Sequence, residues 1–104
     1  MASGWVAVGP QADLAAGGHA VYELDGRFIA VYRVGDEYYA IEDQCTHDGE
    51  SLEGGAVEGH EVICPRHGAR FCLRTGQALT PPAYAPVPVF PVRAADGQLW
   101  IDAG

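Results

Sequence analysis

The chain has 104 residues, of which 48% are hydrophobic, and this size and composition suit one compact domain covering residues 1–104. Fourteen carboxylate side chains against six basic ones give a formal charge of −8 at neutral pH. This excess of negative charge argues against a nucleic-acid partner or an anionic membrane surface.

The first elements along the chain are short. Residues 5–8 are rich in β-branched and aromatic side chains and predict a strand. Residues 12–16 favour a helix, but Gly17-Gly18 ends it after a single turn, before a stable helix length is reached. No longer helix is predicted anywhere in the chain.

The clearest pattern covers residues 20–42, where three runs of β-branched and aromatic residues are separated by Asp25-Gly26 and Gly35-Asp36. Such dipeptides are typical of tight hairpin turns, so this region predicts three antiparallel strands. Its aromatic residues are expected to pack within the sheet and the core, namely Tyr22, Phe28, Tyr38 and Tyr39.

Further short strands are predicted at residues 61–63, 69–73, 87–92 and 99–102. Many short strands divided by Gly and Pro indicate an all-β fold, an antiparallel β-sandwich or small barrel. The polar residues of chemical interest lie between the strands, in a loop at 43–59 and a tighter loop at 64–68. Loops of this kind hold functional side chains on a rigid scaffold.

The cysteines are best interpreted through the compartment of the protein. The first basic residue is Arg27, so the N-terminus lacks the charged region of a secretory signal. No run reaches the roughly 18 apolar residues of a membrane-spanning helix, which predicts a cytoplasmic protein without a membrane partner. Thiols stay reduced in the cytoplasm, so three cysteines near histidines indicate metal ligands rather than disulfides.

Two pairs of candidate metal ligands lie in the two loops. Cys45 and His47 form a C-x-H pair, and after sixteen residues Cys64 and His67 form a C-x-x-H pair. Loops at the ends of neighbouring strands can bring two thiolates and two imidazoles around one centre. These four residues are therefore the candidate metal site.

The sequence C-T-H, its spacer and C-P-R-H-G resemble the Rieske [2Fe–2S] signature, and the flanking segments resemble small bacterial Rieske-type ferredoxins. This resemblance implies a Rieske-like β-sandwich with cluster-binding loops at one end and one [2Fe–2S] cluster per chain. It implies Cys45 and Cys64 as ligands of one iron. His47 and His67 would bind the other iron, which lies nearer the solvent in the family.

The resemblance also implies a function. The chain would be a soluble ferredoxin, not an enzyme in itself, that carries single electrons from an NAD(P)H-dependent flavoprotein reductase to a terminal ring-hydroxylating oxygenase. It would bind no small-molecule substrate directly.

Departures from the family pattern narrow the subtype. Respiratory and photosynthetic Rieske proteins brace the cluster loops with a disulfide, at positions where this chain has Glu50 and Arg66. They also place hydroxyl groups where this chain has Ala69 and Phe71. Because such donors favour the reduced cluster, we expect a low reduction potential here, roughly −150 mV.

Two other functions stay open at this point. An accessory redox subunit, related to the small subunit of nitrite reductase or to iron–sulfur assembly, would use the same ligands with another electron acceptor. A structural zinc module would also use two cysteines and two histidines. Typical zinc fingers, however, pair cysteine with cysteine and histidine with histidine.

Other residues near the loops receive simpler interpretations. Cys72 is expected to be a small buried apolar side chain, and His19 and His60 to be exposed in loops. Thr80-Pro81-Pro82 resembles the loop that covers a Rieske cluster. The arginines of the second loop region are expected either to pair with carboxylates of the first loop or to stay solvated, the two sets being Arg66, Arg70 and Arg74, and Asp48, Glu50 and Glu53.

Overall fold

The computed structural model describes residues 4–15, 17–24, 26–44, 51–52, 55–65, 68–81 and 85–102. In chain order these residues form β1 (Trp5–Pro10), the single 3-10 turn η1 (Gln11–Asp13), β2 (His19–Leu24), β3 (Arg27–Val34), β4 (Glu37–Glu42), β5 (Val57–Glu58), β6 (Glu61–Ile63), β7 (Arg70–Cys72), β8 (Val89–Phe90), β9 (Val92–Ala95) and β10 (Gln98–Asp102). The strand pairs between them are antiparallel. The predicted all-β fold class is confirmed.

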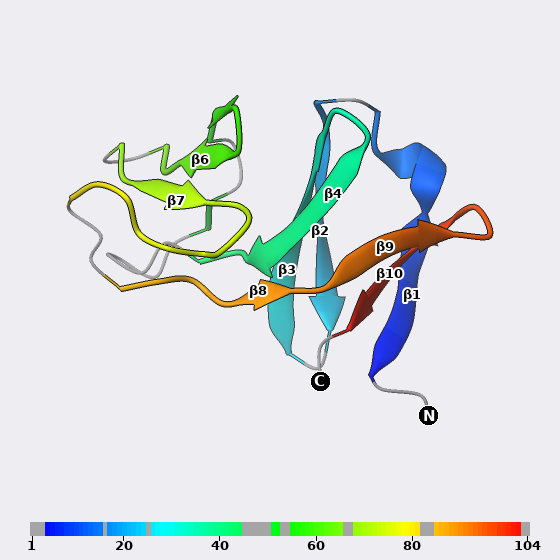
Figure 1. Ribbon diagram of the computed structural model, residues 1–104. Coiled ribbons are helices and arrows are strands. Elements are labelled where there is room, and N and C mark those ends of the chain that lie inside the picture. Colours follow the sequence, from blue (N-terminus) through cyan, green and yellow to red (C-terminus); the bar gives the residue numbers. More distant parts are fainter. Residues whose placement is uncertain are drawn as a thin grey trace.

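The strands form three sheets, with the orders β1-β10-β9, β2-β3-β4-β8 and β5-β6-β7. Figure 1 shows the sheet containing β2, β3 and β4 in the middle of the molecule, between the other two. The loop that joins β6 to β7 and the chain that follows β4 both lie on the side of the small β5-β6-β7 sheet. The described bases of the two predicted ligand loops therefore lie toward one end of the fold.

The middle sheet separates two hydrophobic cores, and β3 contributes to both. Ala30 and Tyr32 belong to the core shared with the small sheet, whereas Ile29 and Val31 belong to the core shared with β10. Alternate side chains of a strand point to opposite faces, so a strand between two cores is apolar on both. This explains the unbroken apolar run of β3 and fixes its register.

Phe28 differs from the prediction that it packs in the core. It lies one residue into β3 and its side chain is 55% exposed. It shares a strand face with Ala30 and Tyr32, but the core on that face does not extend as far as Phe28. The composition of the run could not show where the opposing layer stops.

The predicted hairpin turn at Gly35-Asp36 is present, and Asp96-Gly97, a dipeptide of the same kind, forms another, whereas Asp25 of the other predicted pair lies outside the described residues. Gly35-Asp36 joins β3 to β4, and Asp96-Gly97 joins β9 to β10 with φ values of 55° and 75°. Two consecutive positive φ angles suit a two-residue hairpin whose twist matches that of its strands. Asp is among the few residues other than Gly that adopt this conformation readily.

The predicted strand at residues 87–92 is divided in two. β8 pairs with β4, and β9 pairs with β10 in another sheet, with Pro91 between them. Proline has no amide proton for a sheet hydrogen bond, so the chain leaves one sheet and enters the other at this residue. The short strand β5 was not predicted, because two exposed residues carry no alternating pattern.

Among the described residues, helical structure is limited to η1, in agreement with the single turn expected before Gly17-Gly18. In the ranges described above, no helix has the length and apolar character needed to cross a membrane.

Candidate metal centre

The loop between β6 and β7 is closed by its own backbone. The amide of Cys64 donates to the carbonyl of Ala69 at 2.7 Å, and the amide of Gly68 donates to the carbonyl of Cys64 at 3.0 Å. Gly68 has a φ of 75°, in the left-handed region that favours glycine. Backbone hydrogen bonds therefore join the described ends of the C-P-R-H-G segment, Cys64 and Gly68.

The Cys64 side chain points inward from this turn. Cys64 is 1% exposed and belongs to the core that contains Leu52, Val62 and Phe71. The next residue, Pro65, is exposed, and so is Gly68 on the other side of the turn. The loop thus has one buried thiol at its base, and the described residues on either side of Arg66 and His67 are exposed.

The first loop leaves β4 at Asp43 and returns to the core at Leu52. The Asp43 carboxylate accepts a hydrogen bond from the Ser51 hydroxyl at 2.6 Å and one from the Leu52 amide at 2.9 Å. The Asp43 amide donates to the carbonyl of Phe28 at 2.7 Å. One residue therefore joins the entrance of the loop to its exit and to the start of β3.

Beyond Leu52 the chain passes directly over β6. The amide of Gly55 donates to the Leu52 carbonyl at 3.1 Å, and the amide of Ile63 donates to the Ala56 carbonyl at 2.9 Å. A Cβ atom on Gly55 would collide with the carbonyl oxygen of Ile63. This close approach places the exit of the first loop beside β6, the strand that ends at Ile63 immediately before Cys64.

A third segment runs beside β7. The amide of Leu79 donates to the Arg70 carbonyl at 2.8 Å, and the Arg70 amide donates to the Thr80 hydroxyl at 3.0 Å. Pro81, which follows, is exposed. The beginning of the predicted covering loop is thus attached to the strand that follows the second ligand loop, whereas Pro82 lies outside the described residues.

Of the four predicted ligands, only Cys64 is among the described residues; Cys45, His47 and His67 lie outside them. Within the described part of the chain, no group of three or more His, Cys, Asp and Glu side chains is arranged to hold a metal ion. The described residues instead show the supports of the predicted site, which are the bases of both ligand loops and the start of the third segment.

A family model for the Rieske [2Fe–2S] domain matches residues 4–91. The chain belongs to this family. It is 44% identical over 75 residues to the ferredoxin subunit of 3-phenylpropionate/cinnamic acid dioxygenase from Escherichia coli (strain K12), an alignment that covers 71% of each chain.

Two solved structures of ferredoxins have the same fold. The ferredoxin of carbazole 1,9a-dioxygenase from Nocardioides aromaticivorans IC177 superposes with a TM-score of 0.88 and 31% identity, covering 95% of this chain and 97% of that one. A chain from a complex of reduced oxygenase and oxidized ferredoxin in carbazole 1,9a-dioxygenase superposes with a TM-score of 0.88 and 35% identity, covering 97% of this chain and 94% of that one. As a Rieske protein, the chain carries a [2Fe–2S] cluster.

The described part of the site fits such a cluster. A thiolate ligand needs a position that excludes competing water and is fixed by its surroundings, and Cys64 is buried in a packed core at a backbone-closed turn. Ala69 and Phe71 are fully buried beside it. Neither side chain has a hydroxyl, in keeping with the low-potential type of Rieske site predicted above.

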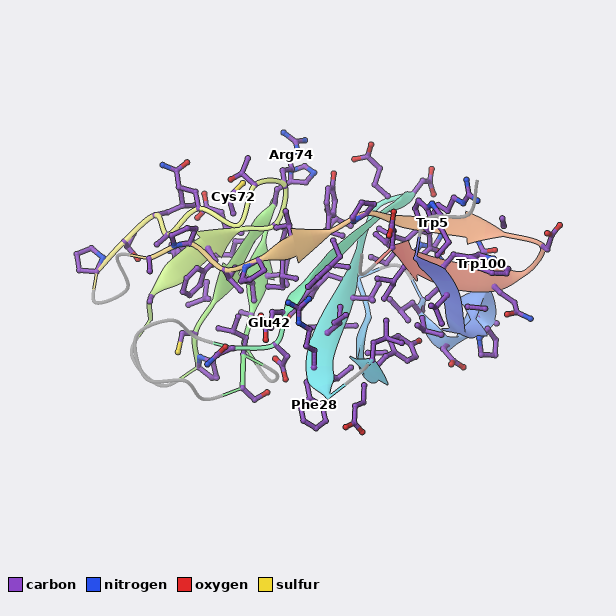
Figure 2. All side chains as sticks on the ribbon, turned by 90° about the horizontal axis from the view of Figure 1, so that it is seen from below. Trp5, Phe28, Glu42, Cys72, Arg74 and Trp100 are labelled. Carbon is purple, nitrogen blue, oxygen red and sulfur yellow. The ribbon has the colours of Figure 1, made fainter. Side chains whose placement is uncertain are left out.

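Cys72 differs from its predicted role as a buried apolar side chain. It is half-buried, and the pKa of its thiol is lowered, chiefly by a hydrogen bond with the Thr75 side chain, against the opposing effect of burial. Figure 2 shows Cys72 and Arg74 together at one edge of the molecule, while Phe28 projects from the opposite edge. The prediction was wrong because sequence patterns do not show how β7 is covered.

His60 was expected to be exposed but is half-buried at the turn between β5 and β6. Its ring packs edge-on against Tyr39, with centroids 5.5 Å apart, and Arg74 Nη2 lies 3.1 Å from its Nε2 atom. A hydrogen bond with the Tyr39 side chain raises the pKa of Arg74. His60 thus links the small sheet to the middle sheet, whereas His19 is exposed as expected.

Arg70 pairs with two carboxylates of its own sheet. Its Nη1 atom lies 3.0 Å from Glu58 and 3.2 Å from Glu61, and both hydrogen bonds raise the pKa of the guanidinium group. The expected partners in the first loop are outside the described residues, and so is Arg66. Because Arg70 and both carboxylates are partly exposed, solvent screens these pairs and each contributes little to stability.

Two supports of the site were not predicted from the sequence: the pair of Asp43 with Ser51, and the Thr80 hydroxyl. Asp and Ser commonly accept or donate hydrogen bonds near turns, so an Asp two residues before Cys45 was an available signal. Its partner eight residues later could not be identified without the path of the loop.

Proposed function

We propose that the chain is a ferredoxin that delivers single electrons to the terminal oxygenase of a ring-hydroxylating dioxygenase system. The observation that carries this proposal is its 44% identity to a dioxygenase ferredoxin subunit over 71% of both chains. The similar chain from a complex of reduced oxygenase and oxidized ferredoxin supports electron transfer from the ferredoxin to the oxygenase. The protein is thus an electron-transfer component and leaves the chemistry on the organic substrate to the oxygenase.

We propose Cys45, His47, Cys64 and His67 as the ligands that hold the cluster. The support for Cys64 is its burial at a rigid turn, and the support for the other three is their spacing from it. When bound, the cluster supplies one-electron redox chemistry. The role of the chain is to hold two thiolates and two imidazoles in fixed positions and to keep water from the thiolate side.

The exposure of Pro65 and Gly68 in the second loop supports electron exchange with a partner at this part of the surface. Pro65 and Gly68, which flank Arg66 and His67, are both exposed while Cys64 is buried. Electron transfer between proteins requires a close approach of the two centres. We therefore propose that a partner approaches at this end of the molecule, on the side of His67.

A flavoprotein reductase is the proposed electron donor. NAD(P)H gives up electrons in pairs as hydride, whereas a Rieske cluster accepts one at a time, so a flavin is needed to divide the pair.

A cytoplasmic location and a single domain for residues 1–104 stay predictions. The sheet shared between two cores supports the second of these.

The first experiment joins composition to spectroscopy on one sample. Purified protein should contain iron and acid-labile sulfide in equal amounts, and it should give the EPR signal of a reduced Rieske cluster after dithionite treatment. Zinc without sulfide, after anaerobic reconstitution as well, would contradict the cluster and leave the zinc module.

The second experiment tests the electron acceptor. The pre-reduced protein is mixed with the oxidised terminal oxygenase of the 3-phenylpropionate dioxygenase system, and cluster oxidation is followed by visible absorption. Rapid, concentration-dependent oxidation is expected. A cluster-loaded protein that reduces no such oxygenase, but does reduce a nitrite reductase, would support the accessory redox subunit instead.

A further inference from the structure

The two ligand loops are closed in different ways. Backbone hydrogen bonds close the second loop, from the Cys64 amide to Ala69 and from the Gly68 amide to Cys64. In the described part of the first loop, no backbone-to-backbone hydrogen bond joins residues 43–44 to residues 51–52. The carboxylate of Asp43 makes that connection through the Ser51 hydroxyl and the Leu52 amide.

We infer that Asp43 is the positioning residue of the first ligand loop and that it sets the placement of Cys45 and His47 by closing the base of that loop. The inference rests on the proposed role of these two residues as ligands. Six residues, 45–50, separate Gln44 from Ser51, so fixing both ends of so short a segment restricts its possible paths. Asp43 itself contacts neither the cluster nor an electron partner in this account.

Asp43 is suited to this role because both of its sides are anchored. Its amide donates to the Phe28 carbonyl in β3, and its two carboxylate oxygens accept from separate donors. Leu52, which supplies one donor, is fully buried in the core that also contains Cys64. The base of the first loop is thereby attached, through Leu52, to the same core that contains Cys64 of the second loop.

Hydrogen bonds to a carboxylate are stronger than neutral ones, and their loss leaves a donor unsatisfied. The Asp43 closure is therefore a brace between the two ends of the first loop that depends on a side chain.

The test compares two neutral substitutions at the same position. Asp43→Asn removes the charge but keeps an oxygen acceptor for the Leu52 amide and a polar group for Ser51, whereas Asp43→Ala removes both side-chain hydrogen bonds. In the holoprotein, D43A should lose its cluster to a chelator roughly tenfold faster than D43N, as expected for losing bonds of this strength. D43A should also show broadened EPR lines and a reduction potential displaced from that of D43N.

Two further variants complete the comparison. Ser51→Ala removes one of the two bonds and should fall between D43N and D43A. Asp36→Asn, at a fully exposed carboxylate in the Gly35-Asp36 turn, removes the same charge elsewhere and should match the wild type in all three measurements.

Equal behaviour of D43A and D43N would overturn the inference, because the hydrogen bonds would then make no difference. Equal effects of D36N and D43A would also overturn it, since net charge alone would explain them. The proposed function fails separately, when the wild-type protein itself lacks the cluster signal or does not reduce an oxygenase.

Discussion

Cys64 and Cys72 show how two cysteines eight residues apart acquire different chemistry. Cys64 is held at the base of a turn with 1% of its surface exposed, and its neighbours are apolar. Cys72 lies half-buried on β7, with Thr75 hydrogen-bonded to its sulfur. The first environment suits a metal ligand protected from solvent, and the second leaves a thiol that reagents can reach.

The two cysteines should respond oppositely to the same substitution. Cys64→Ala is expected to abolish the cluster, because it removes a proposed thiolate ligand. Cys72→Ala, the matched control, should retain iron, sulfide and the EPR signal. Iron and sulfide assays on both variants decide the matter, and a C64A protein with a full cluster would remove Cys64 from the ligand set.

The Cys72 thiol should react with alkylating agents at lower pH than an ordinary cysteine, since a lowered pKa increases the thiolate fraction at any given pH. Thr75→Val removes the first cause of that shift. The profile of Cys72 alkylation rate against pH should therefore move to higher pH, with slower reaction at neutral pH.

Mass spectrometry of the Cys72 peptide measures this alkylation rate at each pH. Thr80→Val makes the same change at a hydroxyl that accepts a hydrogen bond from the Arg70 amide, and it should leave the pH profile of Cys72 alkylation unchanged. Superimposed profiles for wild type and T75V would show that Thr75 does not determine the reactivity.

For individual residues, the sequence was informative where the chemistry depends on the spacing between cysteine and histidine residues. The two cysteine–histidine pairs identified the family, and the comparisons agree with it. The environment of His60 could not be predicted, because its partner Tyr39 lies on β4, far away in sequence. Thr75 lies only three residues after Cys72, but the sequence pattern does not show that its hydroxyl bonds to the thiol.

Among the elements, the exit of the first loop lies in close backbone contact with β6. Gly55 faces the carbonyl of Ile63 with no room for a side chain. The two ligand loops are thus placed by a direct contact between chain segments, and only glycine permits it.

Gly55→Ala should push the first loop away from β6, lower the free energy of unfolding by about 2 kcal/mol and accelerate cluster loss. Gly26→Ala provides the control. Gly26 has a φ of 81° and open space around its Cα, so alanine there should cost about 1 kcal/mol in backbone strain without affecting cluster retention.

Denaturation and chelator challenge of both variants supply the two measurements. A G55A protein that holds its cluster as firmly as G26A would show that the segment can shift without disturbing the ligands.

Most strands could be predicted because their information is local. β-branched runs separated by Asp-Gly and Gly-Asp pairs gave β2, β3 and β4, whose hairpins close within a few residues. The division of residues 87–92 at Pro91 was not predicted, since it depends on two different partner strands, β4 and β10. The same holds for β5, which exists through its pairing with β6.

For the molecule as a whole, the decisive feature is the middle sheet with a core on each face. β3 supplies buried residues to both, and β4 does so through Ala40 and Ile41. Disturbing either core therefore disturbs a strand that the other requires. The sequence indicated an all-β fold but not this sharing, because the apolar run of β3 is equally compatible with one thick core.

The shared sheet predicts a single cooperative unfolding transition. Trp5 and Trp100, the only tryptophans, lie together in the β1-β10-β9 sheet, away from the edge marked by Cys72 (Figure 2). Tryptophan fluorescence thus monitors one end of the molecule, and the visible absorption of the cluster monitors the other. In one guanidinium titration, both signals should change with the same midpoint.

Loss of the cluster colour well before the fluorescence change would show that the ligand end unfolds independently. Residues 1–104 would then not behave as a single domain.

The different closures of the two ligand loops also bear on how freely the sequence can vary. A turn held by amide and carbonyl groups keeps its shape with many side chains. A deep mutational scan should therefore find Arg66 broadly replaceable, although it lies between the proposed ligands Cys64 and His67. A loop held by a carboxylate and a hydroxyl has no such freedom. Substitutions at Asp43 and Ser51 should be tolerated mainly in combinations that restore an acceptor facing a donor, and this pairwise dependence should be absent from the second loop.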